Sequence, residues 1–200
     1  MMSVFVGIDL AASPRRPTGV CVIRGRQVKT TVAYDDDELL GFIKRVKPTY
    51  VGVDAPLFLP LGRCCLRDDC TCLRTIHFRE CDLELRRRGI RFFPITLGPM
   101  RMLTDRGIRL AGILSSSGHT VLETYPGAAQ DVWGIPRQSN VQGLRRGLRR
   151  FVDFNRRRLT CHELDAVTCA LLARFHAQGQ TESIGREEEG WMILPRGKWK

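Results

Sequence analysis

The chain has 200 residues, of which 43% are hydrophobic, and this suits one compact domain, 1–200, rather than two. It lacks an apolar run of the roughly 18 residues that a membrane-spanning helix needs, so we expect no membrane partner. The N-terminal MMSVFVGIDL has neither a basic stretch nor a small-residue cleavage site, which predicts a first strand rather than a signal peptide, and a cytoplasmic location.

The net charge is +11, and nearly all the basic residues are Arg, since only five of the 32 are Lys. Arg keeps its charge and pairs bidentately with phosphate. The excess therefore favours a polyanionic partner, nucleic acid above all. The alternative is an Arg-rich surface that serves only ion pairing.

The first quarter of the chain alternates short apolar runs with turn signals. An amphipathic helix with acidic residues in its first turn and basic residues in its last is expected at 35–47, ended by Pro48. Strands are expected at 3–10, 19–24, 27–33 and 49–54. The first three form an antiparallel meander, and the fourth lies parallel to the first after a crossover.

Pro, Gly and Cys then dominate an irregular, Cys-rich insertion at about 58–81. The remaining pattern predicts a short helix at 81–89, a helix near 99–114, a strand at 119–124, a basic helix at 139–155, an apolar helix at 162–177, a polar loop at 178–189 and a last strand at 191–194.

Two predicted strands end in the same way, with Gly, an apolar residue and Asp. These are Gly7-Ile8-Asp9 and Gly52-Val53-Asp54. Asp is disfavoured in strands and is rarely buried without a partner, so each Asp needs an explanation. Glycine at the same place in each strand lets another element approach the backbone closely.

Two further acids stand on apolar elements. Asp165 lies on the helix that is apolar around most of its circumference, and Glu123 ends the 119–124 strand. Carboxylates that converge repel one another and raise each other's pKa, and a hard divalent cation, Mg²⁺ or Mn²⁺, relieves this conflict. We therefore expect Asp9, Asp54 and Asp165 to bind metal, with Glu123 completing the catalytic group. Separate helix caps and salt bridges are the alternative.

Six strings occur in a fixed order over nearly the whole chain: VGIDLA (6–11), VGVDAPL (51–57), CDLELRRRGI (81–90), VLETYP (121–126), ELDAVTCAL (163–171) and GWMILP (190–195). This set resembles the family of unknown function numbered 429, whose members are described as predicted nucleases with a ribonuclease H fold. The resemblance implies a ribonuclease H-like α/β domain with a mixed sheet flanked by helices.

The same resemblance assigns the acids. Asp9 matches the acid of the first strand, Asp54 that of the fourth, and Asp165 that of the C-terminal helix. Glu123 matches the family's Glu-x-x-Pro. The Cys-rich insertion departs from the commoner pattern and gains no support from it.

Five cysteines lie within 18 residues of the insertion and its end. Zinc sites use four Cys or His ligands, commonly in C-x₂₋₄-C pairs, and the spacing here does not fit that form cleanly. A structural zinc site is one interpretation, with ligands Cys64, Cys70, Cys72 and Cys81. Disulfides, free thiols and other metals remain open.

Basic clusters predict phosphate contacts that give affinity without sequence choice. The candidates are Arg79, Arg88, Arg145 and Arg149. A solvated basic helix face is the alternative.

Together these patterns predict a divalent-metal-dependent nuclease that acts on DNA or RNA. Two rivals remain: an ATP-binding phosphotransferase of the actin and sugar-kinase type, which shares this fold, and a non-catalytic nucleic-acid-binding protein. ATP titration separates the first, and binding without turnover separates the second.

Overall fold

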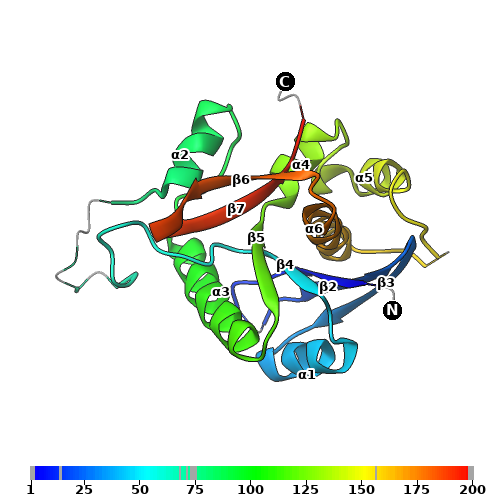
Figure 1. The fold of residues 1–200 in the computed structure, drawn as a ribbon, viewed down its shortest axis with the longest axis horizontal. Helices are drawn as coiled ribbons and strands as arrows, with labels where there is room; N and C mark the ends of the chain where they lie inside the picture. The colour runs from blue at the N-terminus through cyan, green and yellow to red at the C-terminus, as the bar shows by residue number, and fades with distance from the viewer. Residues whose placement is uncertain are drawn as a thin grey trace.

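The computed structural model describes residues 3–13, 15–67, 69–70, 72, 76–155 and 157–197. Within these residues seven strands form one mixed sheet in the order β3-β2-β1-β4-β5-β7-β6 (Figure 1). The strands are β1 Val4–Asp9, β2 Thr18–Arg24, β3 Gln27–Ala33, β4 Tyr50–Asp54, β5 Thr120–Thr124, β6 Thr181–Arg186 and β7 Gly190–Pro195.

The first three strands form the expected antiparallel meander, and β4, β5 and β7 continue it as parallel strands. The register of β1 and β4 places Asp9 directly beside Asp54. On β5, Glu123 lies beside Val53, one residue before Asp54. The pairing of the strands therefore brings three of the four candidate acids to the same end of the sheet, where β1, β4 and β5 finish.

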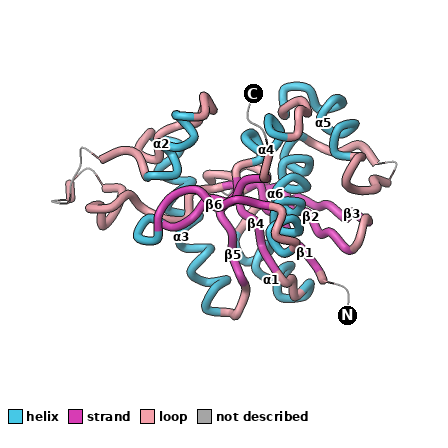
Figure 2. The backbone as a smooth tube through the Cα atoms, turned by 45° about the horizontal axis from the view of Figure 1, so that its top comes forward, coloured by secondary structure: helices cyan, strands magenta, loops and turns pink. Residues whose placement is uncertain are grey.

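Helices cover both faces of the sheet. They are α1 Asp36–Val46, α2 Glu80–Arg87, α3 Gly98–Ser116, α4 Pro126–Val132, α5 Val141–Leu148 and α6 Cys161–Ala177, with 3₁₀ turns η1 Gln138–Asn140 and η2 Glu187–Glu189. Figures 1 and 2 show α1 and α3 on one side of the strands and α4, α5 and α6 on the other. Among the described residues, no helix has the length and apolar character to cross a membrane.

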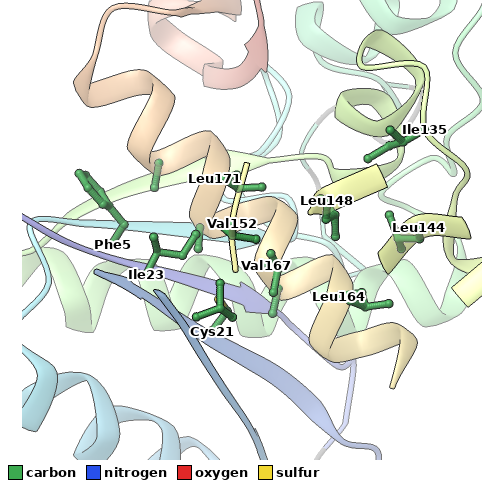
Figure 3. Packing of buried hydrophobic residues seen from close by; sticks show 14 of the residues in the cluster. Phe5, Cys21, Ile23, Ile135, Leu144, Leu148, Val152, Leu164, Val167 and Leu171 are labelled. Carbon is green, nitrogen blue, oxygen red and sulfur yellow. The ribbon is translucent and has the colours of Figure 1, made fainter. Parts of the chain in front are cut away.

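The α6 face holds the largest apolar core (Figure 3). Phe5, Cys21 and Ile23 of the sheet lie under Leu164, Val167 and Leu171 of α6. Leu144 and Leu148 of α5 pack from outside, so α6 is enclosed between the sheet and a second helix. This enclosure explains why the helix is apolar on nearly every side.

The loop expected at 178–189 is wrong. Residues 178–189 contain strand β6 and η2, and β6 pairs antiparallel with β7 at the sheet edge. An edge strand is partly exposed, so the apolar alternation that would have revealed it is weak. Pro126 follows the end of β5 and begins α4, a helix that the sequence analysis did not expect, and its missing N–H costs nothing at a first helical position.

The basic helix expected at 139–155 is shorter than its pattern suggests. The helical part ends at Leu148, and Phe151 and Val152 continue the apolar packing as a turn and extended chain. The backbone of Asp153 then pairs with the β2–β3 turn, where its N–H donates to the carbonyl of Arg26.

Candidate active site

Helix α6 lies directly on three strands, and glycine makes this possible. A Cβ atom on Gly7 would lie 2.0 Å from the carbonyl oxygen of Ala166, and one on Gly52 would lie 2.5 Å from that of Cys169. Gly19 of β2 has the same relation to the carbonyl of His162, at 2.2 Å. Any larger side chain at these positions would push the helix away from the sheet.

The close glycines also fix where the acids point. Side chains alternate between the faces of a strand, so Asp9 and Asp54, two residues after Gly7 and Gly52, project to the α6 face. Asp165 lies on the first half of α6 and is 5% exposed. Sheet and helix therefore bring these three carboxylates toward one another, as the sequence pattern predicts.

Asp54 shows the electrostatic consequence. Burial raises the pKa of Asp54 well above its usual range, and the charges of Asp9, Asp165 and Glu123 raise it further. Within the described chain its carboxylate forms no hydrogen bond or ion pair that would offset this repulsion. The charge of Asp54 itself is thus left without a cation among the described residues.

Asp165 has a similar environment. Burial and the nearby charge of Asp9 raise the pKa of Asp165 to about 7, although a hydrogen bond from Gln130 opposes the shift. Gln130 Nε2 donates to Asp165 Oδ1 at 2.7 Å and also to Thr168 Oγ1. Gln130 belongs to α4, so the unexpected helix holds one of the expected acids in place.

Glu123 differs from the other three because a cation already compensates it. Its Oε2 accepts hydrogen bonds from Arg79 Nη1 at 2.7 Å and from the backbone N–H of Leu57 at 2.8 Å. Its Oε1 is buried and has no hydrogen-bond partner in the described chain. One oxygen is thus committed to structure, while the other adds negative charge near Asp54.

The four acids are less tightly gathered than four ligands of a single ion would be. Among described residues, the only group of three or more candidate metal ligands with all donor atoms within 4.8 Å is a group of cysteines. Among the described acids, no three therefore lie close enough to hold one ion together in this arrangement, so an ion there would contact two of them and be completed by water or substrate.

His162 is a site residue that the sequence reasoning did not single out. Its Nδ1 lies 2.8 Å from Asp9 Oδ2, and this hydrogen bond raises the pKa of the imidazole. The signal was available, because His162 and Asp165 are three residues apart and share one helix face. It becomes meaningful only once α6 is placed over β1.

Two basic side chains lie near the acids. Arg16, in the loop after β1, is exposed and acts electrostatically on His162. Arg137 acts on Asp165 and also interacts with Tyr125 and Asp131. Both belong to loops, where no periodic pattern marks them.

Arg79 is not a surface residue, which corrects the expectation of a phosphate contact there. It is 1% exposed and forms ion pairs with Glu123 and Asp82. Burial acts to lower the pKa of Arg79, but those two charges outweigh it and raise the pKa well above its ordinary value. Its role is to neutralise acids inside the protein.

Two other predicted basic contacts are also engaged elsewhere. Arg88 is half-buried and pairs with Glu84 and Glu182. Arg145 donates to the carbonyl of Asn155 and lies over the Phe154 ring. Neither side chain stands free to follow a phosphate backbone.

Arg149 is exposed but lies away from the acids. Its carbonyl accepts from Arg26, in the β2–β3 turn. The β2–β3 turn, which Arg149 contacts, lies beside the first residue of β1, because Arg24 pairs with Val4. Asp9 is the last residue of β1. At ~3.3 Å per residue, Arg149 and the carboxylates are therefore about 17 Å apart along the strand. Arg149 therefore cannot contact the same phosphate as the carboxylates.

The cysteine ligands expected from the sequence are brought together except for one. Cys64, Cys70 and Cys72 lie close to one another, but the fourth member of the group is Cys65. Cys81 is buried in α2 with Leu85 and Ile184, and its thiol lies 3.7 Å from Asp82 Oδ1. Cys81 is thus a core residue.

Comparisons with known proteins fit this architecture. Residues 7–190 match the family described as "Protein of unknown function (DUF429)". The chain belongs to this family. The DUF429 match covers every acid discussed above, and also the Cys-rich insertion. No curated protein matches the sequence.

Among solved structures, this DUF429 protein is similar to T. thermophilus RuvC in complex with a Holliday junction substrate. The TM-score is 0.54 at 13% identity, and the alignment covers 88% of this chain and 96% of that one. At this identity the likeness establishes the ribonuclease H-like fold. Activity has to be argued from the site itself.

Proposed function

We propose that this protein is a divalent-metal-dependent nuclease whose metal ligands are Asp9, Asp54 and Asp165. The observation that carries the proposal is the register of β1 and β4, which places Asp9 directly beside Asp54. Burial and the charges of Asp9, Asp165 and Glu123 all raise the pKa of Asp54, and no cation among the described residues is beside it. A buried acid group in this state is costly, and a hard cation with oxygen preference resolves it. The orphaned Oε1 of Glu123 supports the same conclusion.

When bound, Mg²⁺ or Mn²⁺ would supply Lewis-acid stabilisation of the negative charge that develops on a phosphodiester. The chain's own groups have distinct tasks. Gln130 holds the Asp165 carboxylate through Nε2, and Arg79 with Leu57 holds Glu123. His162 pairs with Asp9 through Nδ1, so Nε2 is the ring nitrogen that can exchange a proton with substrate or water.

A nucleic-acid partner is supported by the surface beside the acids. Arg137 also lines a cavity of about 570 Å³ that includes Phe93, Phe78 and Arg86. Phe93 is 71% exposed, an unusual state for so large an apolar ring. Single-stranded nucleic acid binds where aromatic rings stack on its bases and Arg side chains neutralise its phosphates. We therefore place the nucleic-acid strand between Arg16 and this cavity.

The proposal is tested with the purified full chain and labelled DNA and RNA substrates, including single strands, duplexes and four-way junctions. Cleavage is expected with Mg²⁺ or Mn²⁺ and is abolished by chelation. Asp9→Asn and Asp165→Asn should each reduce the rate by at least ~100-fold.

Asp105→Asn is the matched control, because Asp105 is an acid on α3 with a side chain 76% exposed. It should cleave like the wild type. Undiminished cleavage by Asp9→Asn, or no cleavage of any substrate with either metal, would contradict the proposal. Tight binding of ATP, with no cleavage, would favour the phosphotransferase alternative.

A further inference from the structure

The Cys-rich segment between β4 and α2 has no regular secondary structure in its described residues. Figure 1 shows it projecting from the sheet beyond β7. Phe58 and Leu61 are exposed, so this segment has little apolar core of its own. A loop of this kind requires some other means of holding one conformation.

Four thiols converge in this loop. The Sγ atoms of the group all lie within 4.8 Å of one another: Cys64, Cys65, Cys70 and Cys72. Four sulfurs around one Zn²⁺ at ~2.3 Å form a tetrahedron with edges of ~3.8 Å. The four thiols thus occupy a space of the right size for a single tetrahedral ion. A cluster of several iron atoms would need a wider arrangement.

Hydrogen bonds that do not involve the thiols hold the loop in the shape that brings the four cysteines together. Arg63 donates through Nε to the carbonyl of Ile76 at 2.7 Å and through Nη1 to the carbonyl of Cys65 at 3.3 Å. The guanidinium thereby ties the two limbs of the loop together on either side of the cysteines. Arg67 lies close enough for Cys65 and Cys70 to act on its charge electrostatically.

The thiols already interact with one another. Cys64 Sγ lies 3.2 Å from Cys70 Sγ. Two donor atoms this close to each other can both contact one ion without a large movement of the loop.

We propose that this loop binds one structural Zn²⁺ ion through four thiolates, those of Cys64, Cys65, Cys70 and Cys72. Four thiolates give zinc a closed coordination shell with no position for substrate, which is the form of structural sites. The nearby guanidinium group of Arg63 offsets part of the net negative charge of the complex, whereas Arg67 is already paired with Asp69. The site is distinct from the carboxylates in ligand chemistry and in place.

Glu189 links the loop to the rest of the fold. This buried residue accepts the N–H of Leu61 at 2.7 Å through Oε1 and the N–H of Glu80 at 2.6 Å through Oε2. Its two oxygens thus hold the two ends of the Cys-bearing segment together. Zinc would fix the tip of the same loop whose base Glu189 closes, and so hold the segment that joins β4 to Arg79.

The test uses the full chain, expressed with zinc in the medium and purified under reducing conditions. Elemental analysis should give one zinc per chain. Cobalt substitution should give the visible absorption of tetrahedral thiolate coordination. Cys65→Ser and Cys70→Ser should each lose most of the zinc and become more sensitive to proteolysis between residues 58 and 79, with far-UV circular dichroism retained.

Cys81→Ser is the decisive control, because the spacing pattern alone admits Cys81 as a ligand and the geometry replaces it with Cys65. It should keep its zinc, and Cys161→Ser, in a half-buried position on α6, gives a second control. Zinc loss in Cys81→Ser with retention in Cys65→Ser would overturn the ligand set. Two disulfides by mass spectrometry, iron or copper at full occupancy, or no bound metal would overturn the site.

The outcome is independent of the proposed nuclease activity. Asp9→Asn should retain one zinc per chain whether or not the wild type cleaves nucleic acid. Zinc that is lost on Asp9→Asn but kept on Cys70→Ser would place the ion at the carboxylates instead.

Discussion

Arg79 Nη1 lies 2.7 Å from Glu123 Oε2, and both side chains are only 2% exposed. The pair joins the residue before α2 to strand β5, beside the candidate metal ligands. The same guanidinium also contacts Asp82 through Nε and Nη2. One buried cation therefore serves two buried acids, and its removal would leave both unpaired.

Arg79→Met should lower the free energy of unfolding by about 3–5 kcal/mol, because it leaves Glu123 and Asp82 as buried charges without a cation. Urea denaturation measures the effect. Adding Glu123→Gln to Arg79→Met should recover part of the loss. Arg109→Met is the control, since that side chain is 58% exposed and its ion pairs are worth ~0–1 kcal/mol. Equal losses in the two single variants would refute a special role for the buried pair.

Gly7→Ala should destabilise the protein strongly, by at least about 3 kcal/mol, because its Cβ would lie 2.0 Å from Ala166 O and 2.3 Å from Ala170 N. These are backbone atoms of α6 that cannot move without separating helix from sheet. Gly112→Ala in exposed α3 meets nothing within 4 Å and should stabilise by ~0.5–1 kcal/mol. Thermal unfolding of both variants tests the contrast, and a Gly7→Ala protein as stable as the wild type would disprove the close packing.

Asp165→Asn should change how stability depends on pH in metal-free protein. Asp165 titrates at about 7 when folded but near 3.8 in an unfolded chain, so the folded state holds the proton more tightly. Its contribution is fully present below about pH 4 and is lost as pH rises to about 7, a change of ~4 kcal/mol at most. Asn has no such loss and can still accept the Gln130 hydrogen bond.

The variant should therefore gain stability relative to the wild type as pH rises from 4 to 8, measured by denaturation in the presence of a chelator. Parallel pH profiles of the two proteins would show that Asp165 is not raised in pKa. A bound divalent cation at pH 8 should reduce the difference, since it would compensate the ionised carboxylate in the wild type.

Phe93→Ala should weaken binding of single-stranded nucleic acid by about 5- to 100-fold, the loss expected for one stacked base. Phe93 is 71% exposed, so its removal should leave unfolding unchanged. Fluorescence anisotropy with labelled oligonucleotides measures the affinity. Tyr34→Ala is the control, because this 53% exposed ring lies before α1, apart from the cavity. Equal affinities in the two variants would remove Phe93 from the proposed path.

Much of the fold could be predicted because its signals are local. The meander, α1 and α6 follow from periodicity and caps that neighbouring residues encode, such as the capping box of Thr160 and Glu163. Strand β6 was not predicted because its sequence, TESIGR, shows little apolar alternation. Its position in the sheet depends on pairing with β7. Helix α4 was not predicted because a proline such as Pro126 is equally compatible with the end of a strand and with the first position of a helix.

The candidate acids divide in the same way. Asp9, Asp54 and Asp165 stood out because an acid on an apolar element is costly wherever it lies. What neutralises each acid is a different matter. Arg79 was expected to meet phosphate and instead pairs with Glu123, 44 residues away in sequence. The sequence contains 27 arginines, and nothing local indicates which of them is buried.

By itself, then, the amino-acid sequence determined most of the strands and helices, though not β6 or α4, and which acids are out of place on them. Local periodicity and the cost of burying charge act on every residue regardless of its distant neighbours. Tertiary structure alone decided the partners: His162 for Asp9, Arg79 for Glu123, and Cys65 in place of Cys81. These partners depend on which side chains the packed sheet and helices bring within a few ångströms of one another. The separation of two residues along the sequence does not indicate this.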